Sequence, residues 1–472
     1  MLNNKITQDK DGKEMPNIKL EIPNYQRPYK WTAKNVIQLL DDIIDAKNDN
    51  KETYRVGTLI LHQKDVEYEY SIVDGQQRTI TFSLLLRVLG AKSIDFLEQP
   101  LSNNPYNTRN IPNNFRTLER RVNNIIDDRE RNELRQYIEN NCELIVVITE
   151  DISEAFQFFD SQNARGKKLY PHDLLKAYHL REMNNLDIVE TEKVVKGWED
   201  LPQKELSLLF SDYLFRLKEW TKGNKAWELT EHNIYKFKGI TKKDNFPYAQ
   251  FFKGAYAFAD NVNHSPMPFV SGTRNLKPFQ LDTPIIAGKP FFDYASHYFE
   301  ILKDIQNNDK YEGYFIKDND IVKTLDLRTN RNGVGNRITR LLFDTAILLY
   351  VDRFCPERPA KIDTEMLDQF VVFAFVWAYS LRAQYYNLGW LSAQNYIMGN
   401  EVTNSFNIYK LISEADSPVT LHSTLSDSLN PLALDKIMAK TDNLELYDEN
   451  NIYQNYLYYF KSNKFLEDKN EN

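Results

Sequence analysis

The sequence predicts an α+β protein in which a small α/β domain is followed by a large all-helical domain. Between about residues 18 and 149, short extended apolar runs alternate with segments of helical spacing. From about residue 185 onward, almost every periodic segment has helical spacing instead. Glycine is scarce, with 16 residues in 472, which is typical of a tightly packed helical protein with few flexible linkers.

The length favours two or more domains. Residues 1–15 are polar and charged without an apolar period, so we expect a flexible arm there. The α/β domain then covers residues 16–182, and the helical domain covers residues 183–472.

In the α/β domain, short extended apolar runs alternate with segments whose apolar residues have helical spacing. The expected strands are 18–22, 56–62, 70–73 and 144–149. A helix is expected over 35–46, because its apolar residues share one face, and a second helix opens at Gln76. Residues 101–114, rich in Asn and Pro, predict a surface loop, and 115–140 predict one highly charged helix.

After Asp151 we expect a helix that ends near Gly166, and then another that begins near His172 and is capped by Asp173. The helices expected further along are 205–220, 294–306, 336–353, 364–383 and 450–461.

Composition excludes some classes of protein. The net charge of -8 argues against a protein that coats DNA without selectivity, although a local basic groove remains compatible with it. The two cysteines and the lack of a leading hydrophobic segment predict a cytoplasmic protein without disulfides. The longest apolar stretch, 370–381, is about half the length needed to span a bilayer, so we expect a buried helix and no membrane contact.

The segment Asp74-Gly75-Gln76-Gln77-Arg78 follows an expected strand and opens an expected helix. Backbone N–H groups at a helix start stabilise a phosphate. Gly75 lets the backbone approach a ligand, Arg78 can bind phosphate oxygens, and Asp74 can hold Mg²⁺ or orient a water. The alternative is an ordinary hairpin or strand-to-helix turn with solvated polar side chains.

The segment 22–31 has three aromatic residues, an arginine and a lysine between prolines that fix an extended path. It could stack a base and bind a phosphate or ribose. Alternatively, it is an edge segment whose aromatic rings cover the following helix. A third polar segment, 163–176, looks by itself like two capped helices.

Four arginines without an acid lie on a flexible turn that opens a helix, and we consider them a weak candidate for DNA phosphates: Arg328, Arg331, Arg337 and Arg340. The alternative is that Arg337 and Arg340 pack against acidic neighbours.

In this order, the three segments resemble the N-terminal domain of the GmrSD-type family. This is the ParB-like and sulfiredoxin-like domain of modification-dependent restriction endonucleases and related phage-defence proteins. The matching residues are Ile22 to Trp31, Gly57-Thr58, Asp74 to Thr79, and then Asn163, Gly166, Leu169, Asp173, Leu174 and Lys176. The resemblance covers about residues 16–182.

The resemblance implies binding and hydrolysis of a nucleoside triphosphate at the turn from Asp74 to Arg78, coupled to recognition or cutting of foreign DNA. From the chemistry of Asp74 we expect Mg²⁺ as cofactor. The catalytic candidates are Asp74, which is also the tentative Mg²⁺ ligand, Gln76, Gln77 and Arg78. The nucleotide-binding candidates are Tyr25, Gln26, Arg27, Trp31, Gly75, Arg78, Asn163 and Lys176.

One departure from the family is important. Many members carry a C-terminal His-metal nuclease, and we find no such motif in this sequence. We therefore expect an NTPase subunit of an antiviral restriction system, with DNA and a separate nuclease chain as partners. A binding module without hydrolysis and a metal-dependent DNA nuclease remain as alternatives, and the oligomeric state stays open, a homo-oligomer included.

Overall fold

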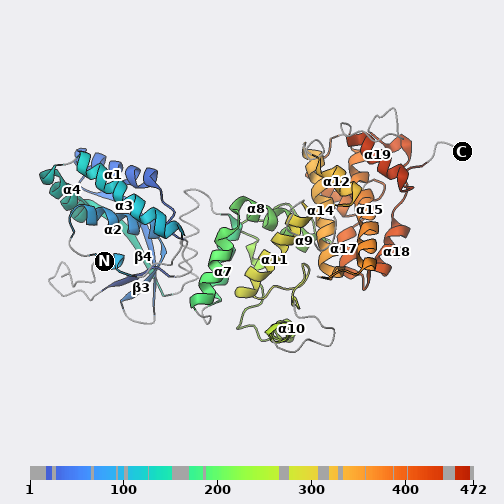
Figure 1. The fold of residues 1–472 in the computed structure, drawn as a ribbon, viewed down its shortest axis with the longest axis horizontal. Helices are drawn as coiled ribbons and strands as arrows, with labels where there is room; N and C mark the ends of the chain where they lie inside the picture. Colours follow the sequence, from blue (N-terminus) through green and yellow to red (C-terminus); the bar gives the residue numbers. More distant parts are fainter. Residues whose placement is uncertain are drawn as a thin grey trace. The chain divides into compact units, whose positions relative to one another are not determined.

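The computed structural model divides into two compact units, Met1–Asp200 and Leu201–Asn472 (Figure 1). It describes residues 18–23, 28–64, 68–91, 94–99, 105–125, 127–150, 170–183, 188–264, 276–306, 318–327, 333–356, 358–385, 387–400, 402–438 and 452–467. A four-stranded sheet near the N-terminus followed by a helical region confirms the predicted α+β class.

The first unit is a mixed sheet covered by helices. Its elements are β1 (Lys19–Glu21), α1 (Ala33–Asn48), β2 (Tyr54–Gln63), β3 (Glu69–Asp74), α2 (Gln76–Val88), the 3₁₀ turn η1 (Asp95–Leu97), α3 (Pro105–Ile125), α4 (Asp128–Asn141), β4 (Cys142–Thr149), α6 (Pro171–Arg181) and α7 (Ile188–Asp200). Each strand overlaps a predicted one.

The strand order of the sheet is β1-β3-β2-β4. β1 pairs with β3 in parallel, β2 pairs with β3 antiparallel, and β2 pairs with β4 in parallel. Helices α1 to α4 supply the side chains that pack on one face of the sheet and form its main core (Figure 1). Because β1 lies beside β3, the chain that leaves β1 starts close to the strand that leads into Gly75.

Two predictions about the charged region are wrong. The loop predicted over 101–114 gives way to α3 from Pro105 onward, because the asparagines of this segment have tertiary partners that outweigh its loop-like composition. The single helix predicted over 115–140 is two helices, since Asp127 caps α4. Its carboxylate accepts hydrogen bonds from the N–H groups of Arg129 and Glu130, at 2.9 and 2.8 Å.

Asp173 lies inside the first turn of α6 rather than ahead of it, because the helix already begins at Pro171. From there its carboxylate accepts a hydrogen bond from the N–H of Tyr170 at 3.1 Å. The predicted arm 1–15 and the helix expected to end near Gly166 lie outside the described residues.

The second unit is helical and is built around α14 and α15, which pack side by side. Its elements are α8 (Gln203–Leu208), the π-helical turn η2 (Leu209–Leu214), α9 (Phe215–Trp220), the 3₁₀ turn η3 (Ile234–Phe237), α10 (Pro247–His264), α11 (Lys289–Ile305), α12 (Asp320–Asp326), α14 (Val334–Phe354), α15 (Lys361–Gln384), α16 (Trp390–Ile397), α17 (Ile408–Glu414), α18 (Pro418–Ser428), the 3₁₀ turn η5 (Leu434–Lys436) and α19 (Ile452–Ser462).

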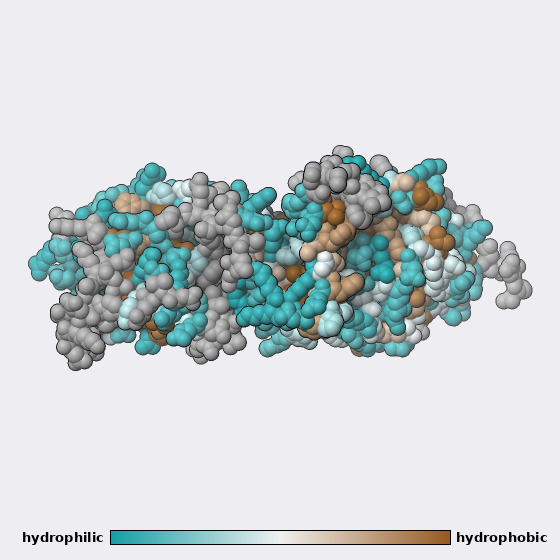
Figure 2. Space-filling view, turned by 90° about the horizontal axis from the view of Figure 1, so that it is seen from below, coloured by the Kyte–Doolittle hydropathy of each residue, from teal (hydrophilic) through white to brown (hydrophobic). Residues whose placement is uncertain are grey.

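The apolar stretch 370–381 lies within α15, where Phe370 and Trp377 are fully buried. In the part of the chain that the structure describes, no helix combines the length and the apolar character needed to cross a membrane. On the face drawn in Figure 2, hydrophilic residues prevail and apolar residues lie in separate patches.

Candidate functional site

The turn after β3 requires a glycine. Gly75 has φ 95° and ψ 0°, in the left-handed region, and α2 begins at the next residue. A Cβ atom on Gly75 would lie 2.9 Å from Leu59 Cδ1 and 3.1 Å from the carbonyl oxygen of Thr58. The turn therefore packs directly on β2, and a side chain here meets both backbone strain and a steric clash.

Arg78 lies over a second glycine. Gly57 in β2 has φ 144°, and a Cβ atom there would lie 1.6 Å from Nη1 of Arg78. The same guanidinium approaches Asp74, with 3.6 Å between Arg78 Nη2 and Asp74 Oδ2, and the two side chains are 26% and 23% exposed. Gly57 thus makes the space that the guanidinium occupies, and Arg78 and Asp74 share an edge that remains partly open to solvent.

Gln77 holds the opening segment in place. Its buried side-chain oxygen accepts hydrogen bonds from the N–H groups of Lys30, at 2.8 Å, and Trp31, at 3.2 Å. Its amide nitrogen donates to the carbonyl oxygen of Pro28 at 3.2 Å. Gln76 is also buried, and its side-chain oxygen has no hydrogen-bond partner among the described residues.

Helix α3 fixes the same segment through asparagines on one of its faces. Asn107 accepts a hydrogen bond from the N–H of Tyr29 at 2.7 Å, and Asn110 donates to the carbonyl oxygen of Tyr29 at 3.0 Å. Asn114 donates to the carbonyl oxygen of Trp31 at 2.7 Å. We did not predict these contacts, although asparagines at positions i, i+3 and i+7 have the spacing of one helix face and could have indicated a helix here.

The ring of Tyr29 is fully buried, and its hydroxyl lies 2.7 Å from Thr81 Oγ1 in α2 and 3.1 Å from Asn114 Nδ2. Burial raises the pKa of Tyr29, so the hydroxyl stays protonated and can donate one of these bonds. Helices α2 and α3 therefore hold residues 28–31 from two sides.

An ion cluster ties the opening segment to the end of the first unit. Glu199 in α7 pairs with Lys30, at 2.5 Å between Oε2 and Nζ, and its other oxygen pairs with Lys176 in α6. Burial by itself would raise the pKa of Glu199, but the two ammonium groups hold it below its ordinary value. Lys176, a predicted nucleotide ligand, is thus buried beside a carboxylate.

Several predicted site residues lie outside the described residues: Tyr25, Gln26, Arg27, Asn163, Arg328 and Arg331. Trp31 is described, and its ring packs partly buried against the main core of the first unit. Arg337 is exposed at the start of α14. Arg340 is buried and pairs with Asp326 and Asp344 at 2.6 Å each. It therefore packs against acidic neighbours, as the alternative prediction had it, and is not available for DNA phosphates.

Among the described residues, no group of three or more His, Cys, Asp or Glu side chains is placed to hold a metal ion. The Asp74 carboxylate is partly exposed at the edge of the turn. A single carboxylate is compatible with Mg²⁺, because this ion commonly takes its remaining ligands from substrate phosphates and water.

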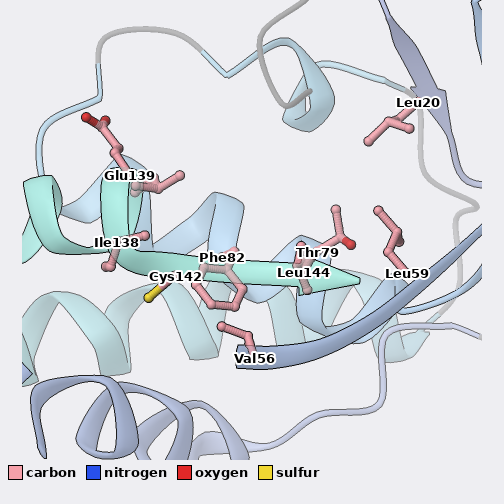
Figure 3. Close-up of a pocket in the computed structure, with 10 residues that line it drawn as sticks. Leu20, Val56, Leu59, Thr79, Phe82, Ile138, Glu139, Cys142 and Leu144 are labelled. Carbon is pink, nitrogen blue, oxygen red and sulfur yellow. The ribbon is translucent and has the colours of Figure 1, made fainter. Parts of the chain in front are cut away.

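The first unit also contains an apolar cavity of about 150 Å³. Leu59 and Thr79 lie at one end of it, and Ile138 and Glu139 at the other (Figure 3). Burial raises the pKa of Cys142, which lines the cavity, to about 11, so this thiol stays protonated at neutral pH. The lining is unsuited to a polyphosphate, and we assign the cavity no role in the site.

The fold and the turn define a class of protein in which an α/β domain with a glycine turn at a helix start precedes a helical domain. Residues 4–180 match the N-terminal domain of the GmrSD restriction endonuclease, so the resemblance inferred from the sequence is confirmed for this domain. Residues 190–440, more than half of the chain, match a family of unknown function (DUF7834), and the chain belongs to this family. No curated protein matches the chain.

Proposed function

We propose that the chain binds and hydrolyses a nucleoside triphosphate at the turn from Asp74 to Arg78, as the nucleotide-handling subunit of a restriction system against foreign DNA. The observation that carries this proposal is the position of Arg78, whose guanidinium lies over Gly57 and remains partly open to solvent. The first N–H groups of α2 lack partners within the helix. Together with Arg78, they form a suitable site for a polyphosphate.

Each polar residue of the turn has a proposed task. Asp74 would hold Mg²⁺, which neutralises charge on the phosphates when it is bound. Hydrolysis joins a water oxygen to the terminal phosphorus and breaks the bond from that phosphorus to the bridging oxygen. The products are a nucleoside diphosphate, inorganic phosphate and one proton, which passes to solvent. The side-chain oxygen of Gln76 is buried and has no partner among the described residues, and we propose that it accepts a hydrogen bond from this water.

Gln77 provides a route from the turn to the end of the first unit. It accepts a hydrogen bond from the N–H of Lys30, whose ammonium group pairs with Glu199, one residue before the unit ends at Asp200. We propose that nucleotide occupancy acts through this route on the helical unit, and thereby on DNA or on a partner nuclease.

The main test combines two measurements on the purified chain. Each nucleoside triphosphate is supplied with Mg²⁺, with and without DNA, and phosphate release and DNA integrity are followed together. We expect phosphate release and intact DNA. Binding without phosphate release would instead favour a non-hydrolysing binding module.

Arg78→Ala tests the site itself. We expect this substitution to weaken triphosphate binding by roughly 2–3 kcal/mol, the scale of a lost charge-assisted contact, while the fold stays intact. Isothermal titration calorimetry measures the affinity and circular dichroism checks the fold. Unchanged affinity in a folded variant would show that the nucleotide binds elsewhere.

Glu199→Gln tests the proposed route. We expect nucleotide affinity to change less than about twofold, because Glu199 has no part in the proposed phosphate site. We also expect DNA to alter the rate of phosphate release in the unchanged chain, and this response to be lost in Glu199→Gln. Lys47 and Glu133 form a partly exposed pair in the same unit, so Glu133→Gln is the matched control and should leave the DNA response intact. A DNA response that persists in Glu199→Gln assigns Glu199 a purely structural role.

A second candidate function is DNA cleavage by this chain itself. The description of the matched N-terminal domain as part of a restriction endonuclease favours it. DNA degradation that requires a divalent metal and disappears in Asp74→Asn would support this candidate over a separate nuclease subunit.

A further inference from the structure

The segment that leads into α10 is rich in both lysine and aromatic residues. Residues 235–253 contain five lysines, one acidic residue and six aromatic residues, in a chain whose net charge is -8. Figure 1 shows α10 at the margin of the second unit, away from α14 and α15. We concentrate on five of these residues, the α10 platform, defined as Lys242, Lys243, Phe246, Tyr248 and Phe251.

The aromatic rings of the platform are unusually exposed. Phe246, Tyr248 and Phe251 are 51%, 59% and 71% exposed. Tyr248 and Phe251 are three residues apart on α10 and therefore share one face of the helix. Most large aromatic residues of the second unit are buried instead, so three neighbouring rings in solvent call for a binding partner.

The exposed rings are supported from below. Phe252, which is partly buried, contacts the ring of Tyr248 at 5.0 Å and that of Phe251 at 5.3 Å between centroids, both edge-on. The buried Ala249 lies close to the side of α10 that is opposite Phe251. The rings are thus held on a fixed helix rather than on a loose loop, and their faces remain available for stacking.

The backbone that carries the lysines of the platform is held by the same helix. Lys253 donates hydrogen bonds to the carbonyl oxygens of Lys242, at 3.0 Å, and Asp244, at 2.6 Å. Gln250 donates to the carbonyl oxygen of Asn245 at 2.9 Å, so the loop follows the first turns of α10. Lys242 and Lys243 are exposed, and neither ammonium group has a carboxylate partner within the described ranges.

We propose that the α10 platform binds single-stranded nucleic acid, with bases stacked on Tyr248 and Phe251 and phosphates at Lys242 and Lys243. Flat aromatic rings next to unpaired cations fit an unstacked strand, because each base has a face that can stack and each linkage carries a negative charge. A duplex keeps its base faces covered. A second copy of this chain would bring lysines against lysines.

The proposal extends the proposed function, since DNA is the partner considered there, but its test needs no nucleotide. A short labelled oligothymidine is titrated with the full chain, and fluorescence anisotropy gives the affinity. The same measurement uses a duplex of equal length. We expect the single strand to bind more tightly than the duplex.

Variants separate stacking from other contacts. We expect Phe251→Ala and Tyr248→Ala each to weaken binding of the single strand by on the order of tenfold. Phe251→Trp should retain it, whereas Phe251→Leu should lose it, because leucine keeps the apolar area without a ring. Leu391→Ala is the matched control, since Leu391 is an exposed apolar residue on α16.

Salt dependence tests the lysines. In Lys242→Gln/Lys243→Gln, we expect the slope of log affinity against log salt to become shallower by roughly 1.4, the value for two lost contacts to a single strand. Lys361→Gln, at an exposed lysine of α15, is the control.

Three outcomes of the DNA titrations would overturn the proposal: no binding to the single strand, equal or tighter binding of the duplex, or full binding by Phe251→Leu. A fourth would be binding to vesicles of anionic lipid that is lost in the platform variants while DNA binding is unchanged in them. Phosphate release, measured separately, is independent of all four. A failure of the platform is therefore distinguishable from a failure of the nucleotide site.

Discussion

Two glycine turns in this chain each open a helix that carries arginines, and the structure uses these arginines in opposite ways. Gly75 precedes α2 with φ 95°, and Gly333 precedes α14 with φ 87°. At the first turn, Arg78 is partly exposed and has one carboxylate at 3.6 Å. Seven residues after the second turn, Arg340 is buried with two carboxylates at 2.6 Å.

The difference shows that an arginine near a helix start indicates an anion site only where nearby carboxylates do not already neutralise it in close ion pairs. Burial alone would lower the pKa of Arg340, but Asp344 and Asp326 raise it above its ordinary value, so the group stays charged within its own ion cluster. Arg78 has a longer, partly solvated pair that a phosphate can replace.

The largest effect that we expect is the loss of stability in Arg340→Leu. The substitution leaves Asp326 and Asp344 buried without their cation, which costs about 3–5 kcal/mol in the free energy of unfolding. Urea denaturation followed by tryptophan fluorescence measures it. The control is Arg337→Ala, at an exposed position of the same helix, which should cost less than about 0.5 kcal/mol. Similar costs for both would remove the contrast between the two helix starts.

The next effect concerns the space that Arg78 occupies. In Gly57→Ala, the new Cβ atom would lie 1.6 Å from Arg78 Nη1, so the guanidinium has to move away. We expect triphosphate affinity to fall by about 2–3 kcal/mol, as in Arg78→Ala, although Gly57 itself has no charge. Calorimetry with Gly254→Ala as control tests this, because a Cβ atom at Gly254 meets nothing within 4 Å. Normal affinity in Gly57→Ala would show that the position of Arg78 over Gly57 is not required.

The sequence was sufficient to predict the elements that its periodicity defines. All four strands and the helices α1, α2, α11, α14 and α15 follow from apolar spacing, because burial of one face determines them. The glycine turn was predictable for the same reason, since the strand before it and the helix after it both have apolar residues at the expected spacing.

What the sequence did not reveal were polar contacts between distant segments. Asn107, Asn110 and Asn114 suggested a loop, and only the folded chain brings them to residues 28–31. Gln77 was a catalytic candidate, and the structure adds hydrogen bonds to the opening segment that composition cannot indicate. Asp344 was the exception, because its position four residues after Arg340 is a helical pairing that the sequence displays.

The smallest effect that we expect is the difference between the two glycines themselves. Gly75→Ala and Gly333→Ala both force alanine to a positive φ, with ψ 0° at Gly75 and ψ 152° at Gly333, which costs on the order of 1–3 kcal/mol at each position. At Gly333 a Cβ atom meets nothing within 4 Å, whereas at Gly75 it lies 2.9 Å from Leu59 Cδ1. Gly75→Ala should therefore have an overpacking cost of about 1 kcal/mol in addition to its backbone cost, whereas Gly333→Ala should have the backbone cost alone. Urea denaturation of both variants measures the difference.

A double variant shows whether this extra cost comes from the contact with Leu59. Leu59→Ala removes the atom nearest to the new Cβ, so Gly75→Ala/Leu59→Ala should be less destabilised than the sum of the two single variants. The carbonyl oxygen of Thr58 stays at 3.1 Å, so we expect partial rather than complete relief. Strict additivity together with equal costs at Gly75 and Gly333 would mean that Gly75 is needed for its backbone conformation alone, and that close packing on β2 plays no part in shaping the turn beside Arg78.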